Sequence, residues 1–80
     1  MNGWCKFTAE DEGGLVIIYS LEDNSSCDGM LFFDKDTKEL SIIALSRGAT
    51  EELTKHFMCS VRGRMRRGYE LNKLYYLAVG

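Results

Sequence analysis

The side chains best suited to chemistry are those of His56 and Cys59, which lie three residues apart in a segment with helical periodicity. Residues at positions i and i+3 of a helix are neighbours, so this pair could supply two zinc ligands, with Cys27 or Asp28 completing the site. A structural zinc site needs four closely placed ligands, and the chain has one histidine and no Cys-x-x-Cys pair. We therefore expect no metal and no cofactor, with the cysteines as small apolar residues.

Cys59 and His56 also resemble a thiol nucleophile with its base. Such a reaction needs hydrogen-bond donors for an oxyanion, and the backbone amides in the middle of a helix are already bonded to the preceding turn. We expect an unactivated thiol, no catalytic residue and no enzymatic activity.

Acidic residues at 34, 36 and 39 resemble the start of a calcium-binding loop. The glycine and the final bidentate glutamate of such a loop are missing, and Lys35 and Lys38 alternate with the acids. This segment is predicted to be a solvated hairpin turn.

Four arginines near the end of the predicted helix are the best candidates for contact with nucleic acid: Arg62, Arg64, Arg66 and Arg67. Tyrosines at 69, 75 and 76 could stack on bases. Cations are also favoured at a helix C-terminus by the helix dipole, and the net charge of the chain is −2. Nucleic-acid binding is therefore the alternative function.

Charge differs between the two halves of the chain. Residues 1–40 hold nine acids and three lysines, a balance of −6, whereas residues 41–80 hold three acids and seven bases, a balance of +4. The simplest interpretation is that an acidic sheet region and a basic helix end attract each other or solvate the surface.

The 80 residues are 45% apolar and 28% charged, which is typical of one globular domain spanning residues 1–80. The longest aliphatic run covers residues 15–19, too short for a signal peptide or a membrane span. Three widely spaced cysteines fit reduced thiols better than disulfides. We expect a cytoplasmic protein with no membrane partner.

Strand patterns dominate the first half of the chain. We expect strands at residues 4–9, 15–21, 30–33, 40–45 and 74–79, which are rich in β-branched and aromatic residues. Gly13 and Gly14 follow an acidic turn, where they are expected to supply positive φ angles.

A helix is predicted between Thr50, a good N-cap, and Gly68, a good C-terminal cap. Glu51 and Glu52 would occupy its first turn, where the helix dipole favours acids. Its apolar stripe would consist of Leu53, Phe57, Val61 and Met65, with Met58 on the flank.

These elements predict an α+β fold of order β-β-β-β-α-β: a mostly antiparallel sheet of four to five strands with one helix packed on one face. Several strands are apolar on both alternating sides, yet one helix can cover only one face. The second face needs a cover, which would be another copy in a homodimer or a different protein partner, unless the sheet curls and buries both faces within one chain.

We therefore expect a non-enzymatic protein-interaction or assembly module that acts through an apolar sheet face. The candidate interaction residues are Val16, Ile18, Phe32, Phe33, Tyr75 and Tyr76. The sequence alone does not decide which of these six point outward.

A set of small, acidic and aromatic residues resembles a pattern found in very short uncharacterised bacterial proteins of unknown function. The residues are Cys27, Asp28, Gly29, Phe33, Asp34, Lys35, Ser46, Gly48, Ala49, Tyr76 and Gly80. The resemblance covers residues 15 to 80. It implies a small stand-alone domain and carries no activity, cofactor or site to these positions.

Overall fold

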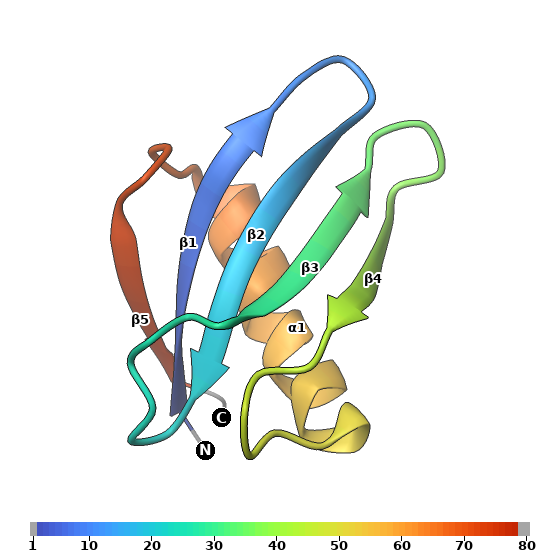
Figure 1. The fold of residues 1–80 in the computed structure, drawn as a ribbon. Helices are drawn as coiled ribbons and strands as arrows, with labels where there is room; N and C mark the ends of the chain where they lie inside the picture. Colours follow the sequence, from blue (N-terminus) through green and yellow to red (C-terminus); the bar gives the residue numbers. More distant parts are fainter. Residues whose placement is uncertain (1, 79–80) are drawn as a thin grey trace.

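Strands and helix follow one another in the expected order in the computed structural model, which describes residues 2–78 (Figure 1). The elements are β1 (Asn2–Glu10), β2 (Gly14–Leu21), β3 (Gly29–Asp34), β4 (Glu39–Ala44), α1 (Glu51–Arg67) and β5 (Leu74–Ala78). The predicted α+β class is confirmed. Residue 79, the expected end of the last strand, lies outside the described residues, as does Gly80.

The strands form one antiparallel sheet in the order β4-β3-β2-β1-β5. β2 pairs with β1 on one side and with β3 on the other, and β1 also pairs with β5. In the order of five strands, β2 is therefore the central one. β4 and β5 are the two edge strands, so the sheet stays open instead of closing into a barrel.

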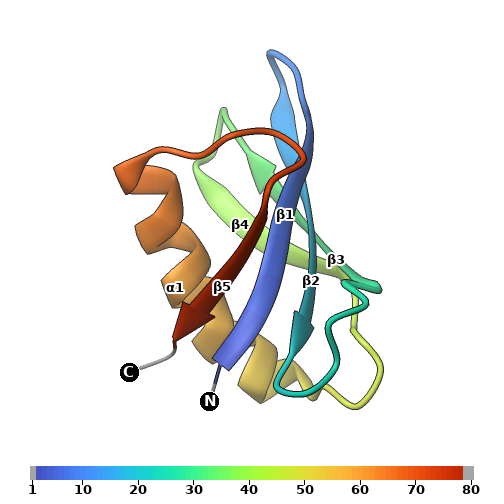
Figure 2. The ribbon, with the colours of Figure 1, turned by 90° about the vertical axis from the view of Figure 1, so that its left-hand side faces the viewer.

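Helix α1 packs against one face of this sheet (Figure 2). Between them lies the core, whose fully buried members include Phe7, Ile17, Tyr19, Leu31, Phe57 and Val61. The predicted helix limits are confirmed: the Thr50 hydroxyl accepts a hydrogen bond from the Leu53 amide, and the Gly68 amide donates to the Met65 carbonyl. Gly68 has a φ of 97°, a conformation that favours glycine.

One position of the predicted apolar stripe is wrong. Leu53 is 39% exposed, and Thr54 is fully buried in its place, in line with Phe57 and Val61. The reason is the phenol of Tyr19, which reaches into the core with a polar end that needs partners. Tyr19 Oη lies 2.8 Å from Thr54 Oγ1 and accepts a hydrogen bond from the Ser46 amide at 3.1 Å.

The turn between β1 and β2 also differs from expectation, because neither Gly13 nor Gly14 has a positive φ. Asp11 holds the turn instead: its Oδ1 accepts hydrogen bonds from the amides of Gly13 and Gly14 at 2.8 and 3.0 Å. Gly14 is needed for space, since a Cβ there would overlap the Phe32 ring and lie 2.6 Å from the Phe33 carbonyl oxygen.

Substitution of these adjacent glycines provides a matched test. We expect Gly14→Ala to lower the free energy of unfolding by about 1–3 kcal/mol, because the backbone and the Phe32 ring must shift. Gly13→Ala places a Cβ 3.5 Å from Asp11 Oδ1, an ordinary contact, and is expected to change stability by less than about 1 kcal/mol. Urea denaturation measures both values, and equal effects would contradict this explanation.

Glu10 joins three segments at the acidic end of the sheet. Its carboxylate accepts hydrogen bonds from Lys35 Nζ at 2.7 Å and from the Tyr69 hydroxyl at 2.9 Å. These bonds, first that of Lys35 and then that of Tyr69, hold the pKa of Glu10 below its ordinary value of 4.5. The end of β1, the β3–β4 turn and the segment after α1 are thereby linked.

The sign of this pKa shift predicts a pH dependence. Stabilisation by the Glu10 carboxylate should be complete above pH 4.5 and disappear as the pH falls through the lower folded-state pKa. We expect Glu10→Gln to cost up to about 1 kcal/mol at pH 7, the usual limit for an exposed pair, and progressively less as the pH falls through the lower folded-state pKa of Glu10. Thermal unfolding of the parent and the variant between pH 7 and acidic pH measures this difference. A difference in stability that does not change with pH would refute the prediction.

Candidate protein interface on the open face of the sheet

The face of the sheet opposite α1 carries the candidate site. Directly paired residues of neighbouring strands share a face, and the pairs Lys6–Ile18, Ile18–Met30 and Val16–Phe32 all lie away from the helix. We call this surface the open face. Its members are Trp4, Lys6, Val16, Ile18, Met30, Phe32, Ser41, Leu74 and Tyr76, with Ile43 two residues along β4 from Ser41.

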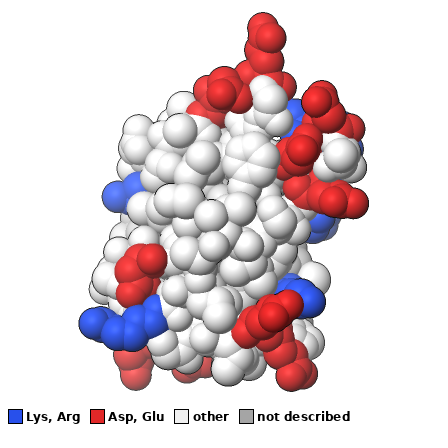
Figure 3. All heavy atoms as spheres, turned by 45° about the vertical axis from the view of Figure 1, so that its right-hand side comes forward, with Lys and Arg blue, Asp and Glu red and all other residues white. Residues whose placement is uncertain are grey.

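Large apolar side chains of the open face are exposed to solvent. The exposed fractions are 39% for Met30, 58% for Ile43, 45% for Leu74 and 54% for Tyr76. A broad area without charged side chains crosses the molecule below the acidic turns (Figure 3). The sheet therefore does not curl to bury both of its faces within one chain.

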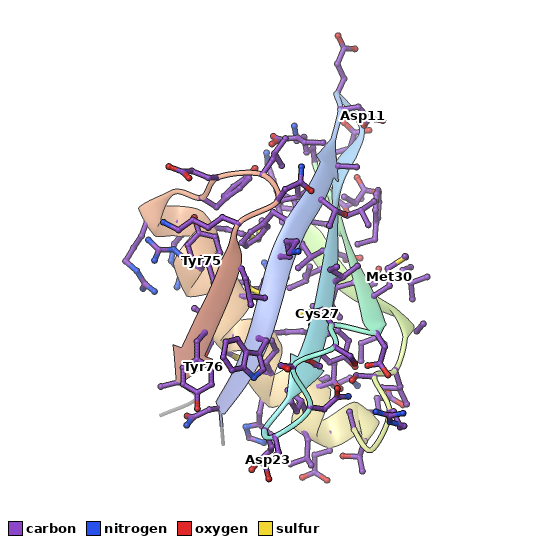
Figure 4. The ribbon with its side chains drawn as sticks, turned by 60° about the vertical axis from the view of Figure 1, so that its left-hand side comes forward. Asp11, Asp23, Cys27, Met30, Tyr75 and Tyr76 are labelled. Atoms are coloured by element: carbon purple, nitrogen blue, oxygen red, sulfur yellow. The ribbon has the colours of Figure 1, made fainter. Side chains whose placement is uncertain are left out.

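Four of the six residues predicted for the interface lie on this face: Val16, Ile18, Phe32 and Tyr76. Phe33 and Tyr75 point to the opposite face, where both pack against the buried core. Tyr75 lies on the α1 side of β5 and Tyr76 on the other side (Figure 4). The reason is the two-residue period of a strand, which cannot place adjacent residues on the same face.

Three exposed residues of the open face were not predicted: Met30, Ile43 and Leu74. Met30 has the same parity as Phe32 in its strand, and Leu74 the same parity as Tyr76, so the two-residue period identifies them once one member is placed. Ile43 lies within an irregularity in the pairing of β3 with β4, between Ile42, the partner of Leu31, and Ala44, the partner of Met30. No sequence signal marks that irregularity.

Part of the open face is covered by the loop between β2 and β3. Ser20 is fully buried under this loop, where its hydroxyl accepts a hydrogen bond from the Cys27 amide at 3.1 Å. The Trp4 indole donates to the Glu22 carbonyl at 3.2 Å. Asp28 anchors the loop by bonding the Ser46 hydroxyl at 2.5 Å. The exposed large apolar side chains therefore lie on β3, β4 and β5, outside the part that this loop covers.

Lys6 is the one basic residue on the open face among the described residues. It is paired with Ile18 on one side and Leu74 on the other. Within residues 2–78 no carboxylate lies within 4.0 Å of its ammonium group. The aliphatic stem of a lysine can cover apolar surface while its charge stays in water, so Lys6 is compatible with an interface if the ammonium reaches the rim.

The four arginines do not form a single surface. Arg62 donates to the Lys38 carbonyl at 3.4 Å, toward the β3–β4 turn. Arg64, Arg66 and Arg67 line a separate groove between α1 and β5. Arg64 also lies over the Tyr75 ring, 5.1 Å from its centre.

The structure does not bring the possible metal ligands together. His56 and Cys59 lie on α1, and Cys59 donates to the Lys55 carbonyl at 3.8 Å. Cys27 lies under the loop on the other side of the sheet, against Ser20. Within residues 2–78 no three His, Cys, Asp or Glu side chains are grouped so that they could hold a metal ion.

The β3–β4 turn uses its first acid for local hydrogen bonds. Asp34 Oδ1 accepts from the amides of Asp36 and Thr37 at 2.9 and 3.3 Å. The carboxylate thus caps the turn, and Lys38 completes it with a φ of 64°.

No family model, curated protein or solved structure matches this chain. None of the helical structure within residues 2–78 is long and apolar enough to cross a lipid bilayer.

The three thiols are predicted to differ sharply in reactivity. Burial raises the pKa of Cys5 to about 12 and also raises that of Cys27, whereas Cys59 is exposed. We expect N-ethylmaleimide at pH 7.5 to modify Cys59 at least about tenfold faster than either buried thiol, because a protonated, enclosed thiol is a poor nucleophile. Mass spectrometry of peptides measures the rates, and rapid modification of Cys27 in folded protein would contradict the described loop.

Proposed function

We propose that this chain is a non-enzymatic assembly module whose open face packs against the same face of a second copy. The carrying observation is the exposure of Met30, Ile43, Leu74 and Tyr76 on one sheet face with no helix over it. Large exposed apolar patches usually mark an interaction site. A second copy would remove these side chains from water.

The size of the molecule supports a face-to-face dimer. Its two longest axes measure 33 and 22 Å. The broad side that carries the open face then has a footprint on the order of 700 Å², close to the roughly 800 Å² that each partner buries in an interface of standard size. The whole face must take part for the dimer to be stable.

The strand order favours a two-fold axis along β2, the central strand. Each Lys6 would then face β3 of the other copy instead of the other Lys6, which avoids a like-charge contact. The acidic turns of the two copies would lie at the same end of the dimer, on its rim. Because salt screens repulsion between exposed charges, association should tighten as ionic strength rises.

Two substitutions by lysine, one on the open face and one on the helix, test the proposal. Met30 on the open face and Leu53 on the helix have the same exposed fraction, 39%. Met30→Lys should weaken dimerisation at least about tenfold, because Met30 lies in register with Lys6 and the new ammonium group would be buried opposite Lys6 of the other copy. Leu53→Lys should leave the dimerisation constant unchanged.

Size-exclusion chromatography with light scattering, across a concentration series, measures the association of both variants and the parent. Circular dichroism melts confirm that each variant is folded. A parent chain that stays monomeric at millimolar concentration would overturn the proposal, as would equal weakening by the two substitutions.

A further inference from the structure

A second surface, which shares Tyr76 with the open face, lies between α1 and the edge strand β5, and these two elements approach each other near the end of the strand (Figure 2). It is a groove of about 630 Å³, within the range of ligand-binding clefts. Its lining residues come from the last turns of the helix and the end of the strand: His56, Cys59, Ser60, Gly63, Arg64, Arg66, Arg67, Tyr76, Leu77 and Ala78.

The charge of the groove has one sign. Three arginines and a histidine line it, and no aspartate or glutamate among residues 2–78 belongs to its lining. The attraction expected between the acidic first half of the chain and these arginines does not take the form of ion pairs. The ion pairs within residues 2–78 join Lys35 to Glu10 and Lys55 to Glu51. The groove therefore presents uncompensated positive charge, which favours an anionic ligand.

The β5 side of the groove is a free strand edge, and the hydrogen bonds show which backbone groups point into it. Asn2 accepts a hydrogen bond from the Glu22 amide, so its carbonyl points toward β2. The backbone groups of the odd-numbered residues of β1 must then point toward β5, because the direction alternates along a strand. The hydrogen bond from the Asn72 amide to the Phe7 carbonyl is consistent with this direction.

The backbone groups of Gly3 and Cys5 therefore form hydrogen bonds with those of their partners Leu77 and Tyr75. The backbone groups of Leu74, Tyr76 and Ala78 point outward, because the direction alternates along a strand. Ser60 Oγ donates to the Ala78 carbonyl at 2.9 Å across the groove, which agrees with this assignment. The edge thus offers the amide and carbonyl of Tyr76 and the amide of Ala78.

We propose that this groove binds an extended acidic peptide, which adds to the sheet as a strand beside β5 while its carboxylates contact Arg66 and Arg67. An added peptide strand supplies both donors and acceptors for the free edge, and alternate side chains would point toward the helix. A nucleic acid would supply phosphates for the arginines but no regular amide donors for the Tyr76 carbonyl. The combination of edge and charge therefore favours the peptide.

Gly63 lines the groove and has no side chain that would fill it. It lies in the interior of α1, where glycine costs about 1 kcal/mol relative to alanine. A Cβ at this position would meet the flexible ends of Arg67 at 3.3 Å and Arg66 at 4.0 Å. A larger side chain can therefore be introduced without disturbing the core, and it would fill the groove.

Fluorescence anisotropy with the full chain tests the inference. The probe is a fluorescein-labelled ten-residue peptide of alternating glutamate and valine, at low ionic strength. We expect saturable binding that Arg67→Glu weakens at least tenfold and that Gly63→Leu abolishes. Arg62→Glu makes the same change in net charge outside the groove and should weaken binding less than threefold.

A second peptide, N-methylated at alternate residues on the edge that faces β5, separates strand addition from charge attraction. It keeps every carboxylate but loses its amide donors, and it should bind at least tenfold more weakly. Equal binding of the two peptides would overturn the inference. So would absence of binding at 1 mM peptide, or tighter binding of a ten-nucleotide oligothymidylate than of the acidic peptide.

This inference goes beyond the proposed dimer and can fail separately from it. Met30→Lys should leave peptide affinity unchanged, because Met30 lies on the open face and the groove lies between α1 and β5. Gly63→Leu should likewise leave the dimerisation constant unchanged. Melting curves of each variant establish that the fold is retained, and Gly63→Leu is expected to raise the melting temperature slightly.

Discussion

The structure depends on a simple constraint of coverage: a five-stranded sheet has two faces, and this chain provides a single helix. α1 shields the face that carries Phe7, Ile17 and Tyr19, and the helix-side core is fully enclosed. The β2–β3 loop covers one end of the other face, over Ser20. What remains uncovered is mostly apolar, and the proposed dimer rests on this exposed surface.

Position in the sheet gives the two proposed surfaces different chemistry. The open face is central and apolar, so it suits permanent association driven by burial of side chains. The groove lies at the β5 edge, where unpaired backbone groups and three arginines meet, so it suits a charged, extended ligand. Tyr76 belongs to both, with its ring on the open face against Trp4 and its backbone at the groove.

Much of the fold could be predicted from the sequence, because local signals agreed with one another. Thr50 and Gly68 mark the helix ends by well-understood capping, and period-two patterns located the strands. Strand order, however, depends on long-range pairing that no local pattern encodes. Thr54 was missed because its burial depends on the Tyr19 hydroxyl, 35 residues away. Gly14 was assigned a conformational role, although it serves to make room for Phe32.

For the proposed interface, the composition of the sequence identified strands that contribute to the open face, but not which of their residues point toward it. Phe33 and Tyr75 were included because adjacent aromatic residues look alike until one of them is placed. The central claim, that the open face joins two copies, is tested most directly by isotope-filtered nuclear Overhauser spectroscopy on a mixture of labelled and unlabelled chains. The account predicts intermolecular contacts from the Met30 and Ile18 methyl groups. Intermolecular contacts confined to α1, or none from the open face at millimolar concentration, would contradict it.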